Sequence, residues 1–147
     1  MNSLWHERSR REIIDRLNRL TPDIKPLWGR MSALQMMAHC SDGLRMASGE
    51  LLTTPKKLPV RYPPLKQMIV YWLPFPKNVP TAIELINRTP GPWEKETMDL
   101  VHEIEQFGRR NTGGNWPHHP AFGALSSNAW GVLGYRHMDH HFRQFGI

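Results

Sequence analysis

Apolar residues recur at steps of three and four along four segments of this 147-residue chain, which is the spacing of an amphipathic helix. The segments run from Ser3 to about Leu20, from Ala33 to about Ser48, from Trp93 to about Arg110, and from Ser127 to about Phe145. None shows the two-residue alternation of a strand, and no unit repeats along the chain. The pattern predicts an all-α protein folded as one domain over residues 1–147.

The segment between the second and third predicted helices is rich in proline. Nine prolines occur between residues 50 and 92, and they exclude a long helix or a central strand there. Within it, Leu65 to Leu73 is a short apolar run that predicts two helical turns. A connection of this length can cross over a whole bundle, so the second and third helices are expected to run parallel. The predicted fold is a four-helix bundle with one long Pro-rich crossover.

The ends of the second helix carry clear signals. Ser32 followed by Gln35 three residues later is typical of a capping box, and Gly49 fits the C-terminal stop. We therefore expect this helix to occupy Ala33 to Ser48.

Composition narrows the classes of function. The single cysteine, Cys40, excludes an internal disulfide and any zinc site with two thiolates from one chain, and we expect it to be a small buried residue. No apolar run approaches the roughly 20 residues that span a bilayer, and the first residues lack an export signal, so a cytoplasmic protein without membrane contact is expected.

The net charge of +6 leaves nucleic-acid binding open as an alternative. Five arginines of the first helix could contact phosphates: Arg8, Arg10, Arg11, Arg16 and Arg19. Acidic residues interrupt the run and no nucleic-acid motif accompanies it, so this alternative is ranked last.

Histidines at the end of the chain have the spacing of metal ligands. His137 and His141 lie one helical turn apart, about 40° around the helix and about 6 Å along it, which lets two imidazoles share one ion. His137 and His140 form the other possible pair. His39, on an apolar face of the second helix, is the third candidate, and three imidazoles would leave a coordination position open for catalysis. Imidazole suits zinc and nickel, with iron a further candidate.

The chain resembles the DinB-like superfamily of metal-binding four-helix bundles, in one of its uncharacterised branches. Two runs carry the resemblance: Trp28-Gly29-x-Met31-Ser32-x-x-Gln35-Met36-x-x-His39, and His119-Pro120-x-Phe122-Gly123-x-Leu125 followed by Trp130-Gly131-x-Leu133-x-Tyr135-Arg136-His137-x-Asp139-His140-His141-x-x-Gln144-Phe145-Gly146. The resemblance implies an up-down-down-up bundle, often a homodimer, with a divalent metal on His39, His137 and His141. Relatives include thiol-dependent S-transferases and isomerases, and metal-dependent hydrolases.

The first functional hypothesis is a metal-dependent transferase in which a low-molecular-weight thiol attacks a small electrophile. Its acid–base candidate is His140, Gln144 could orient a ligand, and Arg136 and Arg143 could reach the carboxylates of a peptide-like thiol. The alternative is a hydrolase that uses a metal-bound hydroxide, since a metal held by neutral imidazoles can ionise either nucleophile. A non-catalytic metal-binding protein is a further alternative. His119 could add a ligand or a supporting hydrogen bond, or it could have only a structural role in its turn.

Overall fold

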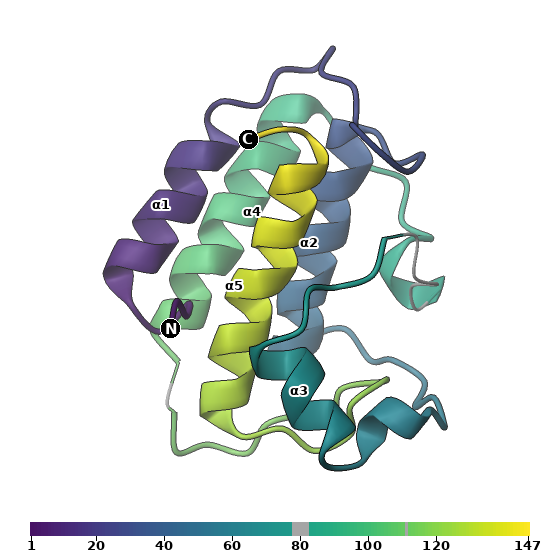
Figure 1. Cartoon of the computed structure of the whole chain (residues 1–147). Coiled ribbons are helices and arrows are strands. Elements are labelled where there is room, and N and C mark those ends of the chain that lie inside the picture. Colours follow the sequence, from purple (N-terminus) through teal and green to yellow (C-terminus); the bar gives the residue numbers. More distant parts are fainter. Residues whose placement is uncertain (78–82, 111) are drawn as a thin grey trace.

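The computed structural model describes residues 1–77, 83–110 and 112–147, and within them the chain is all-helical (Figure 1). It forms five α-helices: α1 (Glu7–Leu17), α2 (Ala33–Ser48), α3 (Leu65–Tyr71), α4 (Trp93–Gly108) and α5 (Ser127–Gln144). Two 3-10 turns lie between them, η1 (Pro59–Arg61) and η2 (Ile83–Leu85). These described residues contain no strand, which confirms the all-α prediction for them.

The helix α2 has the predicted bounds for the predicted reason. The Ser32 hydroxyl accepts from the Gln35 amide at 3.1 Å, and the Gln35 side chain accepts from the Ser32 amide at 2.8 Å. Gly49 ends the helix in the left-handed region, with φ of +82°. Both capping signals are therefore confirmed.

The first helix is shorter than predicted, since α1 begins at Glu7 rather than Ser3 and ends at Leu17 rather than Leu20. The amide of Leu4 donates to the carbonyl of Gly131 at 3.0 Å, so the chain before α1 lies against α5 instead of continuing the helix. The ends of α4 and α5 fall within two residues of the predicted ones.

Replacing Gly131 with alanine is expected to lower the free energy of unfolding by about 1–3 kcal/mol. An added Cβ would lie 2.4 Å from the Trp5 ring and 2.5 Å from the Ser3 hydroxyl, so the N-terminal segment must move. Urea unfolding measures the change. Unchanged or higher stability, as alanine gives at an open helical position, would contradict the close approach.

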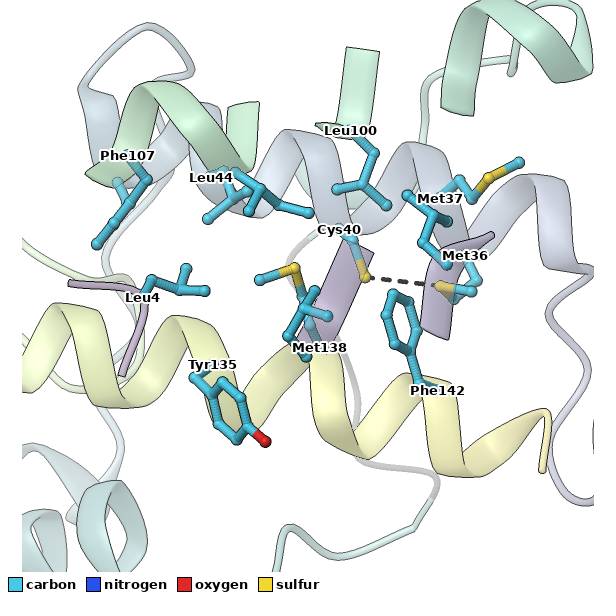
Figure 2. Packing of buried hydrophobic residues seen from close by; sticks show 14 of the residues in the cluster. Leu4, Met36, Met37, Cys40, Leu44, Leu100, Phe107, Tyr135, Met138 and Phe142 are labelled. Carbon is cyan, nitrogen blue, oxygen red and sulfur yellow. Dashed lines mark hydrogen bonds between the residues drawn. The ribbon is translucent and has the colours of Figure 1, made fainter. Parts of the chain in front are cut away.

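The four longer helices share one buried core. The helix α2 packs against α4 and α5, α1 packs against the same two helices, and α3 covers α5 from outside. In the core, Met138 and Phe142 of α5 face Cys40 of α2 and Leu100 of α4, as Figure 2 shows. Each of these side chains is at most 1 % exposed. Burial of a large apolar side chain contributes about 1.5–3 kcal/mol, so this cluster holds α2 and α5 at a fixed distance.

The described residues of the Pro-rich segment form a wall beside the bundle. Its α3 coincides with the two turns predicted at Leu65 to Leu73. Val70 of α3 joins Phe122, Ala129 and Leu133 in a second buried apolar cluster. This cluster attaches the wall to the N-terminal half of α5.

Two of the five arginines of the first helix belong to the interior. Arg10 is buried and donates to the Leu4 and Trp5 carbonyls, and buried Arg16 donates to Asp139 at 2.7 Å. Only Arg8, Arg11 and Arg19 of that set are exposed. The nucleic-acid alternative therefore loses two of its five phosphate-contacting candidates, because Arg10 and Arg16 are engaged with buried carbonyl and carboxylate acceptors.

None of the described helices has the length and apolar character needed to cross a membrane.

Candidate metal centre

Three imidazoles converge between α2 and α5. The Nε2 atom of His137 lies 2.9 Å from Nε2 of His39 and 3.2 Å from Nε2 of His141. The three ring centroids are 4.8 Å apart in every pair, and the nearest ligand atoms all lie within 4.8 Å of one another. In the described part of the chain, this is the one group of three or more histidine, cysteine or acidic residues arranged to hold an ion.

Two of the rings are oriented by hydrogen bonds from their far nitrogens. Nδ1 of His39 donates to the Leu85 carbonyl at 3.0 Å. Nδ1 of His141 donates to the Gln144 amide oxygen at 3.0 Å, and the Gln144 amide nitrogen donates to the Trp28 carbonyl at 2.9 Å. A carbonyl oxygen can only accept, so both protons are on Nδ1, and each Nε2 presents a lone pair to the centre.

This tautomer pattern fits a metal ion. If His137 carries its proton on Nε2, it can donate to Nε2 of His39 or to Nε2 of His141, but not to both. The lone pair of the other nitrogen then has no hydrogen-bond donor. A cation accepts all three lone pairs together. With metal–nitrogen distances of about 2.0–2.1 Å, two nitrogens of a tetrahedral site are about 3.3 Å apart, close to the 2.9 and 3.2 Å that separate Nε2 of His137 from its two neighbours. The residues could therefore hold zinc, nickel or iron, all of which accept imidazole.

Burial keeps these imidazoles neutral. It lowers the pKa of His39 and lowers that of His137 well below its usual value, where His141 and His39 add repulsion. Burial, reinforced by repulsion from His39, lowers the pKa of His141 to about 3. Metal binding requires the neutral ring, so the site is ready for an ion at neutral pH. Burial also raises the pKa of the Cys40 thiol, which keeps Cys40 protonated in the core as a small buried residue.

Metal-free protein is expected to lose thermal stability as the pH falls from 6.5 toward 3, and to show no such loss above pH 6.5. Between these pH values the three histidines bind protons in the unfolded chain but not in the folded site, so protonation favours unfolding. Melting curves in the presence of a chelator measure the effect. The slope should be smaller in His141→Phe, and equal slopes for the two proteins would contradict the assignment.

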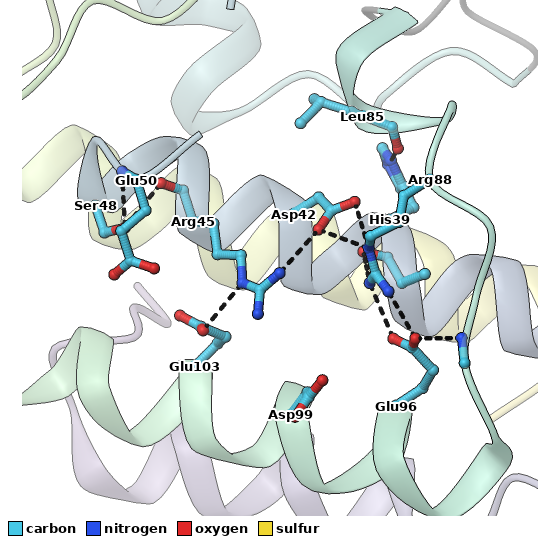
Figure 3. Close-up of polar contacts among 12 residues, drawn as sticks. His39, Asp42, Arg45, Ser48, Glu50, Leu85, Arg88, Glu96, Asp99 and Glu103 are labelled. Atoms are coloured by element: carbon cyan, nitrogen blue, oxygen red, sulfur yellow. Dashed lines mark hydrogen bonds and ion pairs between the residues drawn. The ribbon is translucent and has the colours of Figure 1, made fainter. Parts of the chain in front are cut away.

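A buried ionic cluster stands behind His39 (Figure 3). Nε of Arg88 lies 3.1 Å from both carboxylate oxygens of Asp42, and its two terminal nitrogens lie 2.6 and 2.9 Å from the oxygens of Glu96. The Gly91 amide also donates to Glu96 at 2.7 Å. Hydrogen bonds from Arg88 hold the pKa of Glu96 below its usual value, so a residue with 0 % exposure stays ionised.

This cluster fixes the carbonyl that orients His39. Arg88 follows Leu85 by three residues, and its contacts attach that segment to α2 through Asp42 and to α4 through Glu96. Sequence reasoning missed Arg88. Asp42 lies one turn after His39, but no pattern in the sequence pairs Asp42 with an arginine 46 residues away.

A cavity of about 500 Å³ opens beside the three imidazoles. Its walls come from α2, α5, the Pro-rich segment and the turn at residues 119–122. A cavity of this size is typical of sites for small molecules. The centre is therefore within reach of a ligand.

Two of the four predicted non-metal site residues line this cavity. His140 is half-buried, with its ring 6.0 Å from that of Trp28 and 5.8 Å from that of Phe75. Burial lowers the pKa of His140, which favours its neutral form. Gln144 is buried and orients His141 as described.

The two predicted arginines lie elsewhere. Arg136 donates to the carbonyls of Ile69, Val70 and Leu73, and so attaches α3 to α5. Arg143 is exposed and pairs with Asp139 at 2.9 Å. Neither occurs among the described residues that line the cavity.

His119 shapes the cavity wall and does not join the three imidazoles. Its Nδ1 accepts from the amides of Ala121 at 3.1 Å and Phe122 at 3.2 Å, and its ring lies 5.4 Å from that of Trp130. Of the roles considered for His119, the structure shows the turn-forming one.

Replacing Gln144 with leucine is expected to lower zinc affinity by about 10- to 100-fold, because His141 loses the acceptor that fixes its ring. Titration of chelator-stripped protein measures this. Gln106→Leu, at an exposed position of α4 outside the cavity lining, should leave the affinity unchanged. Equal affinities for both variants would contradict the role of Gln144.

Comparisons with protein-family models, with curated proteins and with solved structures find no match to this chain.

Proposed function

We propose that this chain is a divalent-metal-dependent enzyme that transfers a low-molecular-weight thiol to a small electrophilic molecule. One observation carries the proposal: three neutral imidazoles, two of them oriented through Nδ1, converge at the edge of a small-molecule cavity. Zinc or nickel is the proposed ion, with iron the next candidate.

We further propose that the chain is a DinB-like bundle with up-down-down-up helices, in which the Pro-rich segment is the crossover from α2 to α4. Contacts between α2 and α5 support it. An added Cβ at Gly43 would lie 3.4 Å from His137, and one at Gly134 would lie 3.9 Å from Leu44. Residue number therefore increases along α2 in the direction in which it decreases along α5, as expected for antiparallel neighbours. The family resemblance also suggests a homodimer, which light scattering can test.

A metal held by His39, His137 and His141 would supply positive charge that lowers the pKa of a thiol bound beside it. The chain's own residues then act on the reactants. His140, kept neutral by burial, accepts the thiol proton and passes it to water. The sulfur forms a bond to the electrophilic carbon, and the leaving group departs with its bonding electrons. The overall exchange is therefore R–SH plus R′–X giving R–S–R′ and HX.

Cationic residues at the same end suit the carboxylates of a peptide-like thiol. Arg30 is exposed and lines the cavity, and the Lys77 ammonium lies 4.4 Å from the centroid of the Trp28 ring. This pair takes the place that the sequence suggested for Arg136 and Arg143.

The test is turnover of 4-nitrophenyl acetate and of an alkyl halide by zinc-loaded protein, with and without glutathione. Loss of the halide that requires both zinc and glutathione, and that falls in His140→Phe but not in Arg143→Gln, is the expected result. Ester hydrolysis without thiol would instead establish the hydrolase. Zinc-loaded protein that turns over neither compound would contradict both.

A further inference from the structure

The cavity is long and follows α5. Its lining residues on that helix extend from Trp130 to Gln144, a span of about 21 Å at 1.5 Å per residue. His137 lies at the middle of this span. His137 therefore separates the lining of α5 into two halves.

The half toward Gln144 combines polar and charged side chains with aromatic ones, among them Phe75 beside His140. Trp28, Arg30 and His140 line it, and Gln144 donates to the Trp28 carbonyl at its edge. This is the half to which the proposed function assigns the thiol.

The half toward Trp130 is mostly apolar, although Lys56, whose amide donates to the Pro120 carbonyl at 2.8 Å, also lines the cavity there. Phe122 and Leu133 are buried there in one cluster, against which the partly buried Val60, Ile69 and Ala121 pack. His119 also borders this half, but its Nδ1 accepts from two amides of its own turn. We define the apolar subsite as the space bounded by Val60, Ile69, Ala121, Phe122, Leu133 and Trp130.

We infer that the apolar subsite binds an alkyl or aryl group of the electrophilic substrate, so that the enzyme acts on hydrophobic small molecules. This inference rests on the proposed function. Among the six side chains that bound the subsite, the one polar atom is the indole nitrogen of Trp130, which is buried without a hydrogen-bond partner. A hydrocarbon group that fills the rest of the subsite therefore gains the free energy of apolar burial. With the thiol on the polar side and the hydrocarbon on the apolar side, the reacting atoms of both meet at the imidazoles.

The test uses straight-chain hydroxamic acids, whose head group chelates zinc and whose tail length varies. Their dissociation constants with untagged, zinc-loaded protein are measured by calorimetry, from acetohydroxamic to octanohydroxamic acid. Each buried methylene should tighten binding about fourfold, and the six added methylenes should give at least about 100-fold in total. A dissociation constant that does not change with tail length would overturn the inference.

Matched variants locate the tail. Val60→Trp fills the subsite from a partly buried position and should remove most of the dependence on tail length while leaving acetohydroxamic acid unchanged. Arg30→Trp, in the other half, should keep the dependence. If Val60→Trp does not fold by circular dichroism, Ala121→Phe replaces it. A dependence that survives in the subsite variant would overturn the inference, whereas wild-type protein that binds no zinc would overturn the proposed function itself.

Discussion

Replacing His137 with alanine is expected to lower zinc affinity by about 10²- to 10⁴-fold. This range corresponds to the loss of about a third of the binding free energy of a typical zinc site. His137 is the residue whose Nε2 approaches both other imidazoles, at 2.9 and 3.2 Å. Without His137, the two remaining ligands, His39 and His141, lie on different helices, and no third imidazole lies between them. Zinc titration of chelator-stripped, untagged protein measures the change.

The neighbouring histidine provides the matched control. His140 lies on the same helix, and its ring centroid is 5.3 Å from that of His141, but it is outside the convergent group. His140→Ala should keep zinc affinity within a few-fold of wild type while it lowers the proposed turnover. Similar zinc losses in the two variants would mean that the histidines bind zinc without the predicted geometry.

Replacing Arg88 with methionine is expected to destabilise the fold by about 3–5 kcal/mol, because it leaves buried Glu96 without its arginine and leaves buried Asp42 with only the more distant Arg45. Asp42 and Glu96 are 4 % and 0 % exposed, and Arg88 contacts both. Zinc affinity should also fall by about 10- to 100-fold, since the Leu85 carbonyl that orients His39 loses its anchor. Urea unfolding and zinc titration measure the two effects separately.

Arg45 provides a control that distinguishes the loss of a charge from the loss of His39 positioning. It also bridges α2 to α4, with Glu103 at 3.4 Å and Asp42 at 3.7 Å, and its side chain is 35 % exposed against 30 % for Arg88. Arg45→Met should cost less stability and leave zinc affinity unchanged. If zinc affinity falls equally in both variants, general destabilisation rather than positioning explains the loss.

The sequence was sufficient where the determining interactions are local. Ser32 and Gln35 cap α2 within one turn, and the four-residue step from His137 to His141 needs only helical geometry. The inclusion of His39 needed the apolar pattern of a second helix and the family resemblance. All three imidazoles do lie together in the structure.

The other features of the fold and of the site depend on contacts between segments that are distant in the sequence. Leu4 leaves the helical pattern to meet Gly131, and Arg136 turns to the carbonyls of α3, which no periodicity indicates. Arg88 reaches Asp42 across 46 residues, from a Pro-rich segment without a helical or strand period. These interactions decide which side chains face the cavity, so their absence from the sequence pattern explains the misplaced arginines.

The most direct test of the metal centre is elemental analysis of untagged wild-type protein, with His39→Ala as the comparison. A histidine tag must be absent because it would bind the same ions. The proposed site predicts about one equivalent of zinc, nickel or iron per chain, and almost none in the variant. Wild-type protein without metal, even after reconstitution with each of these ions, would contradict the metal centre and the enzyme proposed from it.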